Sequence, residues 1–222
     1  MIGRRGVFGL LAAIAALGLP STAAAVPTAV FGECGPTAAA NARCGTVAVP
    51  LDRADPASPT IPIAFELTPH ADQSVPAVSA IVLSNGGPGV SNIAAEPIWR
   101  DRLAPLLDTH DLLAVDHRGI GQSAAIDCPG LQHVQGNQLD AARSCGASLA
   151  AASDRYGSGD VADDVDDVRA ALGIDKVDYY GVSYGAVAEA GTASTAARYC
   201  ARRVASAADL SHGNTLSAQN TA

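Results

Sequence analysis

The sequence predicts an α/β fold whose mostly parallel central sheet begins with antiparallel strands on its N-terminal side. Two continuous apolar runs, 80–83 and 111–115, are typical of short strands that are buried on both faces. A helix-period segment at 160–172 leads into a third strand-like run at 177–180. Because strands and helices alternate, right-handed crossovers would place these three strands in one parallel sheet with helices on both faces.

The N-terminal strands are predicted to form a hairpin. Residues 26–43 are loop-rich, and the segment 45–50 then alternates apolar and polar side chains. Proline and aspartate reach turn density over residues 52–60, and alternation returns over 61–67. This order predicts two antiparallel strands joined by a loop, ahead of the parallel part of the sheet.

Two helices are expected in the connections between the strands. Residues 96–107 can form a helix with four large apolar side chains on one face, namely Trp99, Leu103, Leu106 and Leu107. Residues 128–152 are expected to be helical in their second half.

The segment 160–172 has the clearest helical pattern. Its apolar stripe recurs at helical spacing and consists of Val161, Val165, Val168 and Leu172. Ser158 or Asp160 can cap its start, and Gly173 can end it. The aspartates of this helix are interpreted as a solvated face that the helix dipole favours.

The first 25 residues have the composition of a secretory signal peptide. Arg4 and Arg5 give a basic start, residues 7–19 are apolar, and a small-residue cleavage site ends at Ala25. The general and the twin-arginine export routes both stay open, and an uncleaved anchor is the alternative. We therefore expect a secreted chain with three parts: a signal peptide (1–25), the folded domain (26–190) and a divergent low-complexity tail (191–222).

The acidic charge balance limits the partners of the protein. The full chain has a formal net charge of −8, which becomes −10 when Arg4 and Arg5 leave with the signal peptide. Bulk electrostatics therefore oppose binding to nucleic acid or to an anionic membrane. No segment after the signal peptide is long and apolar enough to suggest a membrane span.

Five cysteines in an exported chain predict disulfides. Pairing between neighbours in sequence would give Cys34–Cys44 and Cys128–Cys145, although four cysteines allow three connectivities and the sequence does not choose. Cys200 is left over as a free thiol or as part of an abnormal tail. Metal binding is the alternative, but C-x-x-C and histidines at ligand spacing are absent from the sequence, so neither metal nor cofactor is expected.

Residues 181–185, Gly-Val-Ser-Tyr-Gly, follow the strand-like run 177–180 and lead into an alanine-rich stretch. A strand, a sharp turn and a helix with a serine at the apex are typical of a nucleophile elbow. The flanking Gly181 and Gly185 allow a tight turn and keep bulk away from the Ser183 oxygen. The alternative is an ordinary strand-to-helix loop with a capping serine.

A serine nucleophile needs hydrogen-bond donors for the oxyanion that forms on the attacked carbonyl. One donor is expected to be the backbone N–H of the residue after the nucleophile, here Tyr184. The other is expected from residues 85–89, Asn-Gly-Gly-Pro-Gly, where Gly87 is the predicted donor and Pro88 stiffens the turn. A plain Gly-Pro turn is the alternative.

A third glycine-rich segment, residues 116–123, follows the apolar run 111–115. It lacks the G-K-[ST] sequence of a phosphate-binding loop, so we predict a structural loop that braces the elbow. His117 lies in this segment and is a possible base. It precedes the serine on a different loop, so it is interpreted as structural.

Together these motifs resemble the proline iminopeptidase branch of the α/β-hydrolases. The matching residues are Gly86, Gly87, Pro88 and Gly89, then Asp116, Arg118, Gly119, Gly121 and Ser123, and finally Gly181, Ser183, Tyr184 and Gly185. More narrowly, the aspartate-rich run 160–169 and the placement of the first four cysteines are similar to secreted tripeptidyl aminopeptidases of actinobacteria. The resemblance covers about residues 30 to 190.

The resemblance implies an α/β-hydrolase fold with Ser183 as the nucleophile and oxyanion donors at Gly87 and Tyr184. It also implies acyl-enzyme catalysis on a peptide substrate with a free amino terminus. An esterase or lipase on the same scaffold is the alternative, because selectivity in this family lies in a helical cap and not in these motifs.

The chain departs from the family after the nucleophile, where the triad acid and base normally follow on later loops. Only 39 residues follow Ser183, and the one histidine among them is His212, with Asp209 just before it. A triad from these two is not expected, so we predict a fold that is incomplete at its C-terminus, with no triad acid or base. The nucleophile strand would then become a sheet edge, the chain would be unstable and activity would be impaired. A non-catalytic secreted fragment is the further alternative, and the sequence does not set the oligomeric state.

Overall fold

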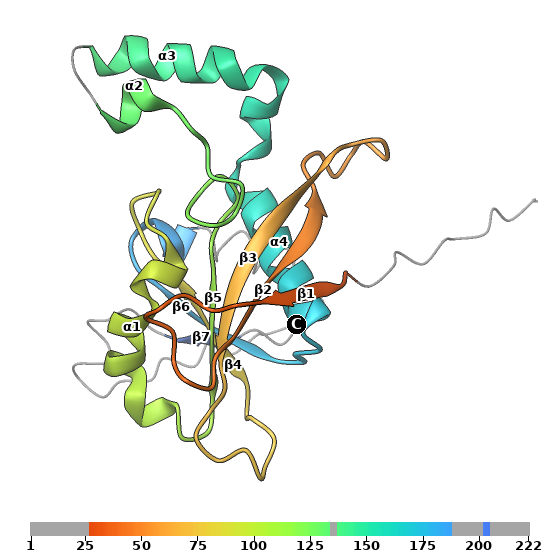
Figure 1. Cartoon of the computed structure of the whole chain (residues 1–222), viewed down its shortest axis with the longest axis vertical. Coiled ribbons are helices and arrows are strands. Elements are labelled where there is room, and N and C mark those ends of the chain that lie inside the picture. The colour runs from red at the N-terminus through yellow and green to blue at the C-terminus, as the bar shows by residue number, and fades with distance from the viewer. Residues whose placement is uncertain (1–26, 134–136, 188–201, 205–222) are drawn as a thin grey trace, which may run out of the picture.

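The computed structural model describes residues 27–133, 137–187 and 202–204. The predicted signal peptide, Cys200, His212 and nearly all of the predicted tail lie outside these residues. A seven-stranded mixed sheet forms the centre of the described part (Figure 1). Its strands are β1 (Ala29–Gly32), β2 (Arg43–Pro50), β3 (Thr60–Thr68), β4 (Ala80–Ser84), β5 (Asp111–Val115), β6 (Val177–Gly181) and β7 (Arg202–Val204).

The strand order is β1-β2-β3-β5-β4-β6-β7. The pairs β1–β2, β2–β3 and β3–β5 are antiparallel, whereas β4 pairs in parallel with both β5 and β6. The predicted antiparallel start and parallel centre are therefore confirmed. Since β5, β4 and β6 run in the same direction, their carboxyl ends lie at one edge of the sheet, where open α/β sheets bind ligands.

One strand was not predicted, because β1 lies inside the segment interpreted as loop. It has only four residues and pairs with Cys44–Val47 of β2. Gly45 makes this pairing possible, since a Cβ there would lie 2.3 Å from the Val30 carbonyl oxygen. The close approach depends on the absence of a side chain at Gly45 in β2. The sequence of β1 itself therefore does not reveal the pairing.

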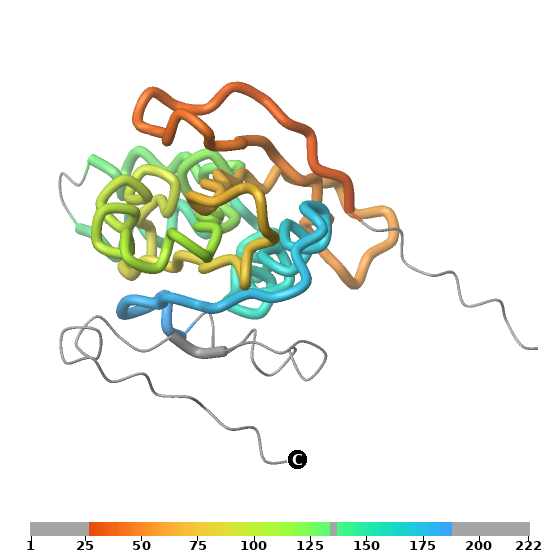
Figure 2. Tube along the Cα trace, turned by 90° about the horizontal axis from the view of Figure 1, so that it is seen from below, coloured from red at the N-terminus to blue at the C-terminus, as the bar shows by residue number. Residues whose placement is uncertain are grey.

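Helices cover both faces of the sheet (Figure 2). On one face lies α1 (Asn92–Leu103), whose Trp99 ring packs against the Tyr180 ring of β6 with centroids 5.1 Å apart. On the other face lies α4 (Ser158–Ala171), whose Val165 and Val168 join the apolar cluster under the sheet. Each face thus has its own core, and the short strands between them are buried on both sides, as their continuous apolar runs predicted.

The first of these helices begins four residues earlier than the predicted 96–107. The Ser91 hydroxyl accepts a hydrogen bond from the Ala94 N–H and caps α1 before its apolar pattern starts. The helix then ends at Leu103, and a 3₁₀ turn (Ala104–Leu106) takes the place of its predicted last residues. Trp99 and Leu103 are buried as expected.

The start of α4 also differs from the prediction. Gly157 occupies the N-cap position, and no side chain caps the helix. The Ser158 hydroxyl is instead within 2.9 Å of the Tyr184 hydroxyl, so the residue expected to cap the helix contacts the predicted elbow. At the other end Gly173 has a φ of 69°, the left-handed conformation expected after a helix C-terminus.

A helical arm projects from the body of the sheet between β5 and α4 (Figure 1). It contains α2 (Pro129–Gln132), α3 (Gln138–Leu149) and a 3₁₀ turn (Ala150–Arg155). No residue of α3 is buried. The disulfide Cys128–Cys145 joins α3 to the residue before α2, and Cys34–Cys44 joins the loop after β1 to β2. Both predicted pairings are confirmed.

The nucleophile strand is not an edge of the described sheet, so that prediction is wrong. Residues 178–180 of β6 pair in parallel with residues 202–204, which form β7 inside the predicted low-complexity tail. The edge strands of the described sheet are β1 and β7. Among the helices that the structure describes, none has the length and apolar character needed to cross a bilayer.

Candidate active site

Ser183 lies at the tip of a sharp turn between β6 and a helix that starts at Tyr184. Its φ is 55°, a left-handed conformation that a residue with a side chain rarely adopts. The Val182 carbonyl accepts from the Gly185 N–H, and the Ser183 carbonyl accepts from the Ala186 N–H, so the turn leads straight into the helix. Ser183 is exposed at this turn, as expected for the serine of a nucleophile elbow.

Two of the glycines beside this turn are required by close contacts. A Cβ on Gly185 would lie 1.9 Å from the Ser84 carbonyl oxygen at the end of β4. A Cβ on Gly86 would lie 2.7 Å from the Ser183 Cβ and 3.2 Å from its Oγ. The elbow therefore packs directly on the end of β4, and the glycine turn that follows β4 lies against the serine hydroxyl.

That turn has an unusual backbone. Gly87 and Gly89 have φ values of 121° and 116°, and the bond between Gly87 and Pro88 is cis. Only glycine adopts such φ values without strain, so this backbone requires glycine at both Gly87 and Gly89. Gly86, the residue before Gly87, is the one that lies against Ser183. The two predicted motifs meet as the resemblance implied.

Buried amides hold the turn in place, and the sequence analysis did not anticipate them. The Asn92 side-chain oxygen Oδ1 accepts from the backbone N–H and the side-chain amide of Asn85, at 2.8 and 3.0 Å. Asn92 donates in turn to the Val115 carbonyl, and the Trp99 indole donates to the Asn85 side chain. These hydrogen bonds connect the Gly-Gly turn to α1 and β5. In the sequence, only the polar pair Ser91-Asn92 just after the glycine turn pointed to these hydrogen bonds.

The loop after β5 holds the start of α1. The buried Asp116 carboxylate accepts hydrogen bonds from the Ser91 hydroxyl and from the backbone N–H groups of Ile93 and Gln122. A Cβ on Gly121, whose φ is 55°, would lie 2.0 Å from Asp116 Oδ2. Gly119 also has a left-handed φ, of 81°. The motif therefore wraps the loop around one carboxylate.

Ser123 closes the same loop. Its hydroxyl donates to the Asp116 carbonyl at 2.7 Å and accepts from the Ala64 N–H of β3 at 2.8 Å. The loop after β5 is thus joined to the neighbouring strand at the carboxyl edge of the sheet.

Arg118 connects this loop to α4 and to the end of β2. Its guanidinium donates to both carboxylate oxygens of Asp164, at 2.7 and 2.6 Å, and to the Pro50, Leu51 and Arg155 carbonyls. Asp164 also accepts from Arg53 at 2.6 Å. Asp164 is only 1% exposed, so the interpretation of the α4 aspartates as a solvated face is wrong at this position. Burial raises the pKa of Asp164, while the two arginines oppose this effect.

A cavity of about 610 Å³ opens beside the elbow. Pro88 and Gly89 line it from the glycine turn, and Tyr184 lines it from the elbow. Apolar side chains from the 116–126 loop, the helical arm and α4 complete the wall, among them Ile120, Ile126, Leu131, Tyr156 and Val161. Its size is in the range of pockets that bind small ligands, and its mostly apolar lining suits an apolar group.

His117 has a structural position, as predicted. It is buried, and its Nε2 lies 3.3 Å from the Ser84 hydroxyl. Burial lowers its pKa, and the nearby Asp116 charge opposes this effect. His70 is engaged elsewhere, with its Nδ1 2.6 Å from Asp111 at the start of β5. In the described residues no hydrogen bond joins a histidine to Ser183 Oγ. Nor do these residues contain a group of three or more side chains suited to hold a metal ion.

The comparisons with known proteins give the class to which this fold and site belong. A family model described as the alpha/beta hydrolase fold matches residues 79–214, which is more than half of the chain. The chain therefore belongs to the alpha/beta hydrolase fold family. The match includes the glycine turn, the Asp116 loop and the elbow, and it confirms the resemblance to the α/β-hydrolases.

Within that family the chain is similar to bacterial peptidases. It is 29% identical over 165 residues to a tripeptidyl aminopeptidase of Streptomyces lividans, covering 64% of this chain and 31% of that protein. It is 30% identical over 169 residues to the serine protease Hip1 of Mycobacterium tuberculosis, covering 65% and 31%. The chain thus spans about a third of the length of these curated relatives.

Solved structures resemble the chain more distantly. A proline iminopeptidase-related protein from Thermus thermophilus is 18% identical, with a TM-score of 0.44, over 72% of this chain and 44% of that one.

Proposed function

We propose that the protein is a serine hydrolase of the aminopeptidase type, with Ser183 as its nucleophile. The observation that carries the proposal is the exposed Ser183 in a left-handed turn, with Gly86 of the glycine turn against its hydroxyl. The similarity to a tripeptidyl aminopeptidase and to a serine protease supports a peptide substrate. We propose a substrate with a free amino terminus, from which an N-terminal residue or short peptide is released.

In the proposed reaction the Ser183 oxygen attacks the scissile carbonyl carbon and the peptide nitrogen leaves as an amine. The N–H groups of Gly87 and Tyr184 would hold the oxyanion of the tetrahedral intermediate. Water then hydrolyses the resulting ester and regenerates the hydroxyl. We assign the acid and the base of the triad to no described residue. Full activity on this scheme requires a base that takes the Ser183 proton, because an unassisted alcohol is a poor nucleophile.

A fluorophosphonate probe tests the nucleophile. The purified protein is treated with the probe, digested and mapped by mass spectrometry. We expect one modified peptide that contains Ser183, and no modification in Ser183→Ala. Ser84→Ala is the matched control, because Ser84 is buried and lies at the end of the neighbouring strand. Modification of another residue, or none at all, would contradict the assignment.

Substrate pairs test the aminopeptidase part of the proposal. We expect hydrolysis of a tripeptide anilide with a free amino terminus, and a large loss of rate when that terminus is acetylated. Faster hydrolysis of short-chain esters with no preference for the free amine would favour the esterase alternative. In each case Ser183→Ala gives the background rate.

We also propose that the protein is secreted after cleavage near Ala25. The two disulfides are compatible with an oxidising compartment. N-terminal sequencing of the exported protein should start at Val26. An intact N-terminus on a cytoplasmic protein would be the opposite result.

A further inference from the structure

The cavity of about 610 Å³ beside the elbow lies next to the two segments that meet at Ser183. Tyr184, the residue after Ser183, lines it. Pro88 and Gly89 line it as well, and they follow closely on Gly86, which lies against the serine. Ser183 is exposed and is not itself part of the wall. A substrate side chain in the cavity can therefore belong to a residue whose backbone lies at the serine.

The wall of this cavity offers almost no charge to a ligand. Its described lining residues include no aspartate, glutamate or lysine. Arg118 is among them, but its side chain is fully buried and already pairs with Asp164 at 2.6 Å. Burial lowers the pKa of His117, which favours the neutral imidazole. A charged group would thus lose its hydration in the cavity without gaining a partner of opposite sign.

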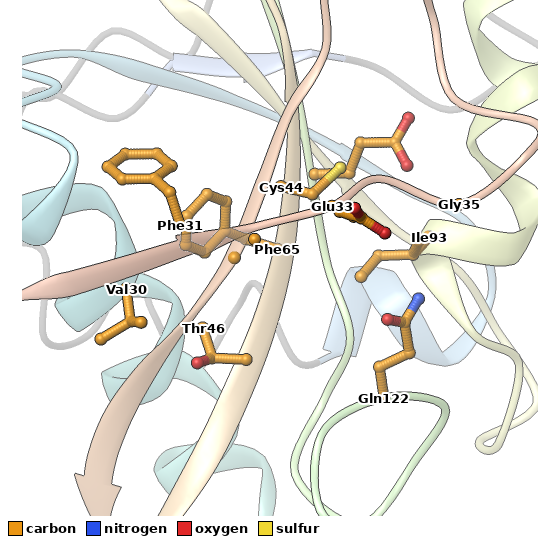
Figure 3. Close-up of a pocket in the computed structure, with 12 residues that line it drawn as sticks. Val30, Phe31, Glu33, Gly35, Cys44, Thr46, Phe65, Ile93 and Gln122 are labelled. Atoms are coloured by element: carbon orange, nitrogen blue, oxygen red, sulfur yellow. The ribbon is translucent and has the colours of Figure 1, made fainter.

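The acids of the other described pocket lie elsewhere. This smaller pocket, of about 250 Å³, runs along β1 and β2, and it shares no lining residue with the cavity beside the elbow (Figure 3). Glu33 and Glu66 are among its lining residues. A free amino terminus carries a positive charge, so the proposed substrate would keep that end outside the apolar cavity beside the elbow.

The helical arm builds one wall of the cavity beside the elbow. Leu131 and Gln132 of α2 line it, and so do both cysteines of the Cys128–Cys145 disulfide. No residue of α3 is buried, so packing on the sheet does not fix the place of this helix. The disulfide is therefore the link that holds α3, and with it this wall, beside α2.

We propose that the cavity is a substrate pocket for a large apolar side chain, such as that of leucine or phenylalanine, on the residue whose carbonyl Ser183 attacks. The arm disulfide holds one wall of the pocket, so loss of the disulfide weakens the preference for large apolar side chains. The inference rests on the proposed function, because the side chain belongs to the substrate of Ser183.

The test is an NMR titration of the ¹⁵N-labelled protein with tripeptide amides that have a free amino terminus. Each peptide has two alanines and then alanine, leucine, phenylalanine, aspartate or lysine. We expect saturable shifts at lining residues such as Gly89, Gly119 and Tyr184. Leucine and phenylalanine peptides should bind about tenfold or more tightly than the other three, because burial of each additional methylene favours binding. Equal affinity for all five, or no saturable shifts at the lining residues, would overturn the proposal.

Two substitutions on the arm place the binding in the cavity. Gln132 is exposed and lines the cavity, so Gln132→Trp fills it without disturbing the core. This change should weaken binding of the phenylalanine peptide by about tenfold or more. His133→Trp is the matched control, because His133 is the exposed next residue and does not line the cavity. Equal affinities of the two variants would show that the peptide binds elsewhere.

Two disulfide variants test the role of the arm. Cys128→Ser/Cys145→Ser should reduce the preference for phenylalanine over alanine by about fivefold or more. Cys34→Ser/Cys44→Ser should keep that preference, since neither cysteine lines the cavity. An unchanged preference in both variants, with circular dichroism spectra that match the unmutated protein, would contradict the assigned role of the arm.

Fluorophosphonate labelling of Ser183 is measured separately and distinguishes the two proposals. Labelling without a side-chain preference would overturn the pocket and leave the nucleophile in place. A side-chain preference without labelling would contradict the hydrolase and leave a binding site for apolar groups.

Discussion

At the scale of single residues, the absence of a side chain at Gly185 determines whether the elbow can form. We expect Gly185→Ala to destabilise the protein by about 3 kcal/mol or more, because its Cβ would overlap the Ser84 carbonyl, which belongs to the backbone of β4 and cannot give way. Urea unfolding followed by circular dichroism measures the change.

Gly159→Ala is the matched control for that prediction. Gly159 lies in the first turn of α4, and a Cβ there would have nothing within 4 Å. The substitution should be neutral or stabilise the protein by up to about 1 kcal/mol, since alanine favours helix. Equal effects of the two substitutions would show that the contact at Gly185 is not tight.

Residue by residue, the sequence predicts the parts of the site that depend on backbone conformation. Ser183, Gly87 and Gly121 all have positive φ values, and glycine-rich motifs announce such turns. It does not predict Asn92 or Asp164, whose roles depend on partners brought from distant segments. A buried asparagine and a solvated one look alike in one sequence, because only the tertiary contact distinguishes them.

At the scale of elements, the Arg118–Asp164 pair holds α4 to the loop after β5. We expect Asp164→Asn to destabilise the protein by about 3 kcal/mol, because it leaves a buried guanidinium without its closest anion. Arg53 keeps Asp163 and Asp167 at 3.8 and 2.8 Å, whereas the buried Arg118 keeps only Asp160, at 3.6 Å, so Arg118 loses the larger share of its pairing. The free energy of unfolding from urea denaturation gives the value.

Asp140→Asn provides the comparison on another helix. Asp140 pairs with Arg143 at 3.2 Å, but both side chains are about two thirds exposed. Such a surface pair contributes less than about 1 kcal/mol. If the two aspartate substitutions cost the same, Asp164 is not the buried anchor that its contacts indicate.

The helical arm depends on its disulfide more than on packing, since α3 has no buried residue. In the double substitution Cys128→Ser/Cys145→Ser we expect amide hydrogen exchange to increase across residues 129–149, with the sheet strands unchanged. The same pair of changes at Cys34 and Cys44 should raise exchange around β1 instead. Increased exchange throughout the sheet after loss of Cys128–Cys145 would show that the arm supports the whole fold.

Elements with a strong periodic pattern were predicted well, and their ends less so. The stripe of α4 and the apolar runs of β4 and β5 follow from burial, which acts on every turn or residue. The start of α1 and the cap of α4 were wrong, because single hydrogen bonds at Ser91 and Ser158 decide them. Short β1 was missed for a similar reason, since its pairing depends on Gly45 in the neighbouring strand.

At the scale of the whole molecule, the buried pair Glu66 and Glu96 links stability to pH. Both pKa values are raised by burial, Glu66 from its ordinary 4.5 to about 7. The folded state therefore holds the Glu66 proton more tightly than the unfolded chain does. Its contribution to stability is complete below about pH 4.5 and is lost as pH rises to about 7.

We expect Glu66→Gln to remove this loss, so that it stabilises the protein by about 3 kcal/mol at about pH 8 relative to its effect at about pH 4.5. Urea midpoints of both proteins at the two pH values give the difference. An equal difference at both pH values would show that Glu66 does not titrate with folding.

The parallel centre of the sheet could be predicted from the sequence, but its edge at β7 could not. The predicted order of strands and helices fixed the parallel centre, because few chain paths satisfy right-handed crossovers. It misplaced the sheet edge, since β7 pairs with β6 through backbone groups that any sequence possesses. Backbone pairing leaves little trace in side-chain pattern, so a short strand in a low-complexity segment was not anticipated.

The central claim is that the Ser183 hydroxyl faces amide donors from the glycine turn and from the elbow. The most direct measurement is a crystal structure of the protein after reaction with a fluorophosphonate. We predict phosphorus bonded to Ser183 Oγ, with the phosphoryl oxygen within about 3.1 Å of the Gly87 and Tyr184 nitrogens. A phosphoryl oxygen turned to solvent, or an adduct on any other residue, would contradict this account of the site.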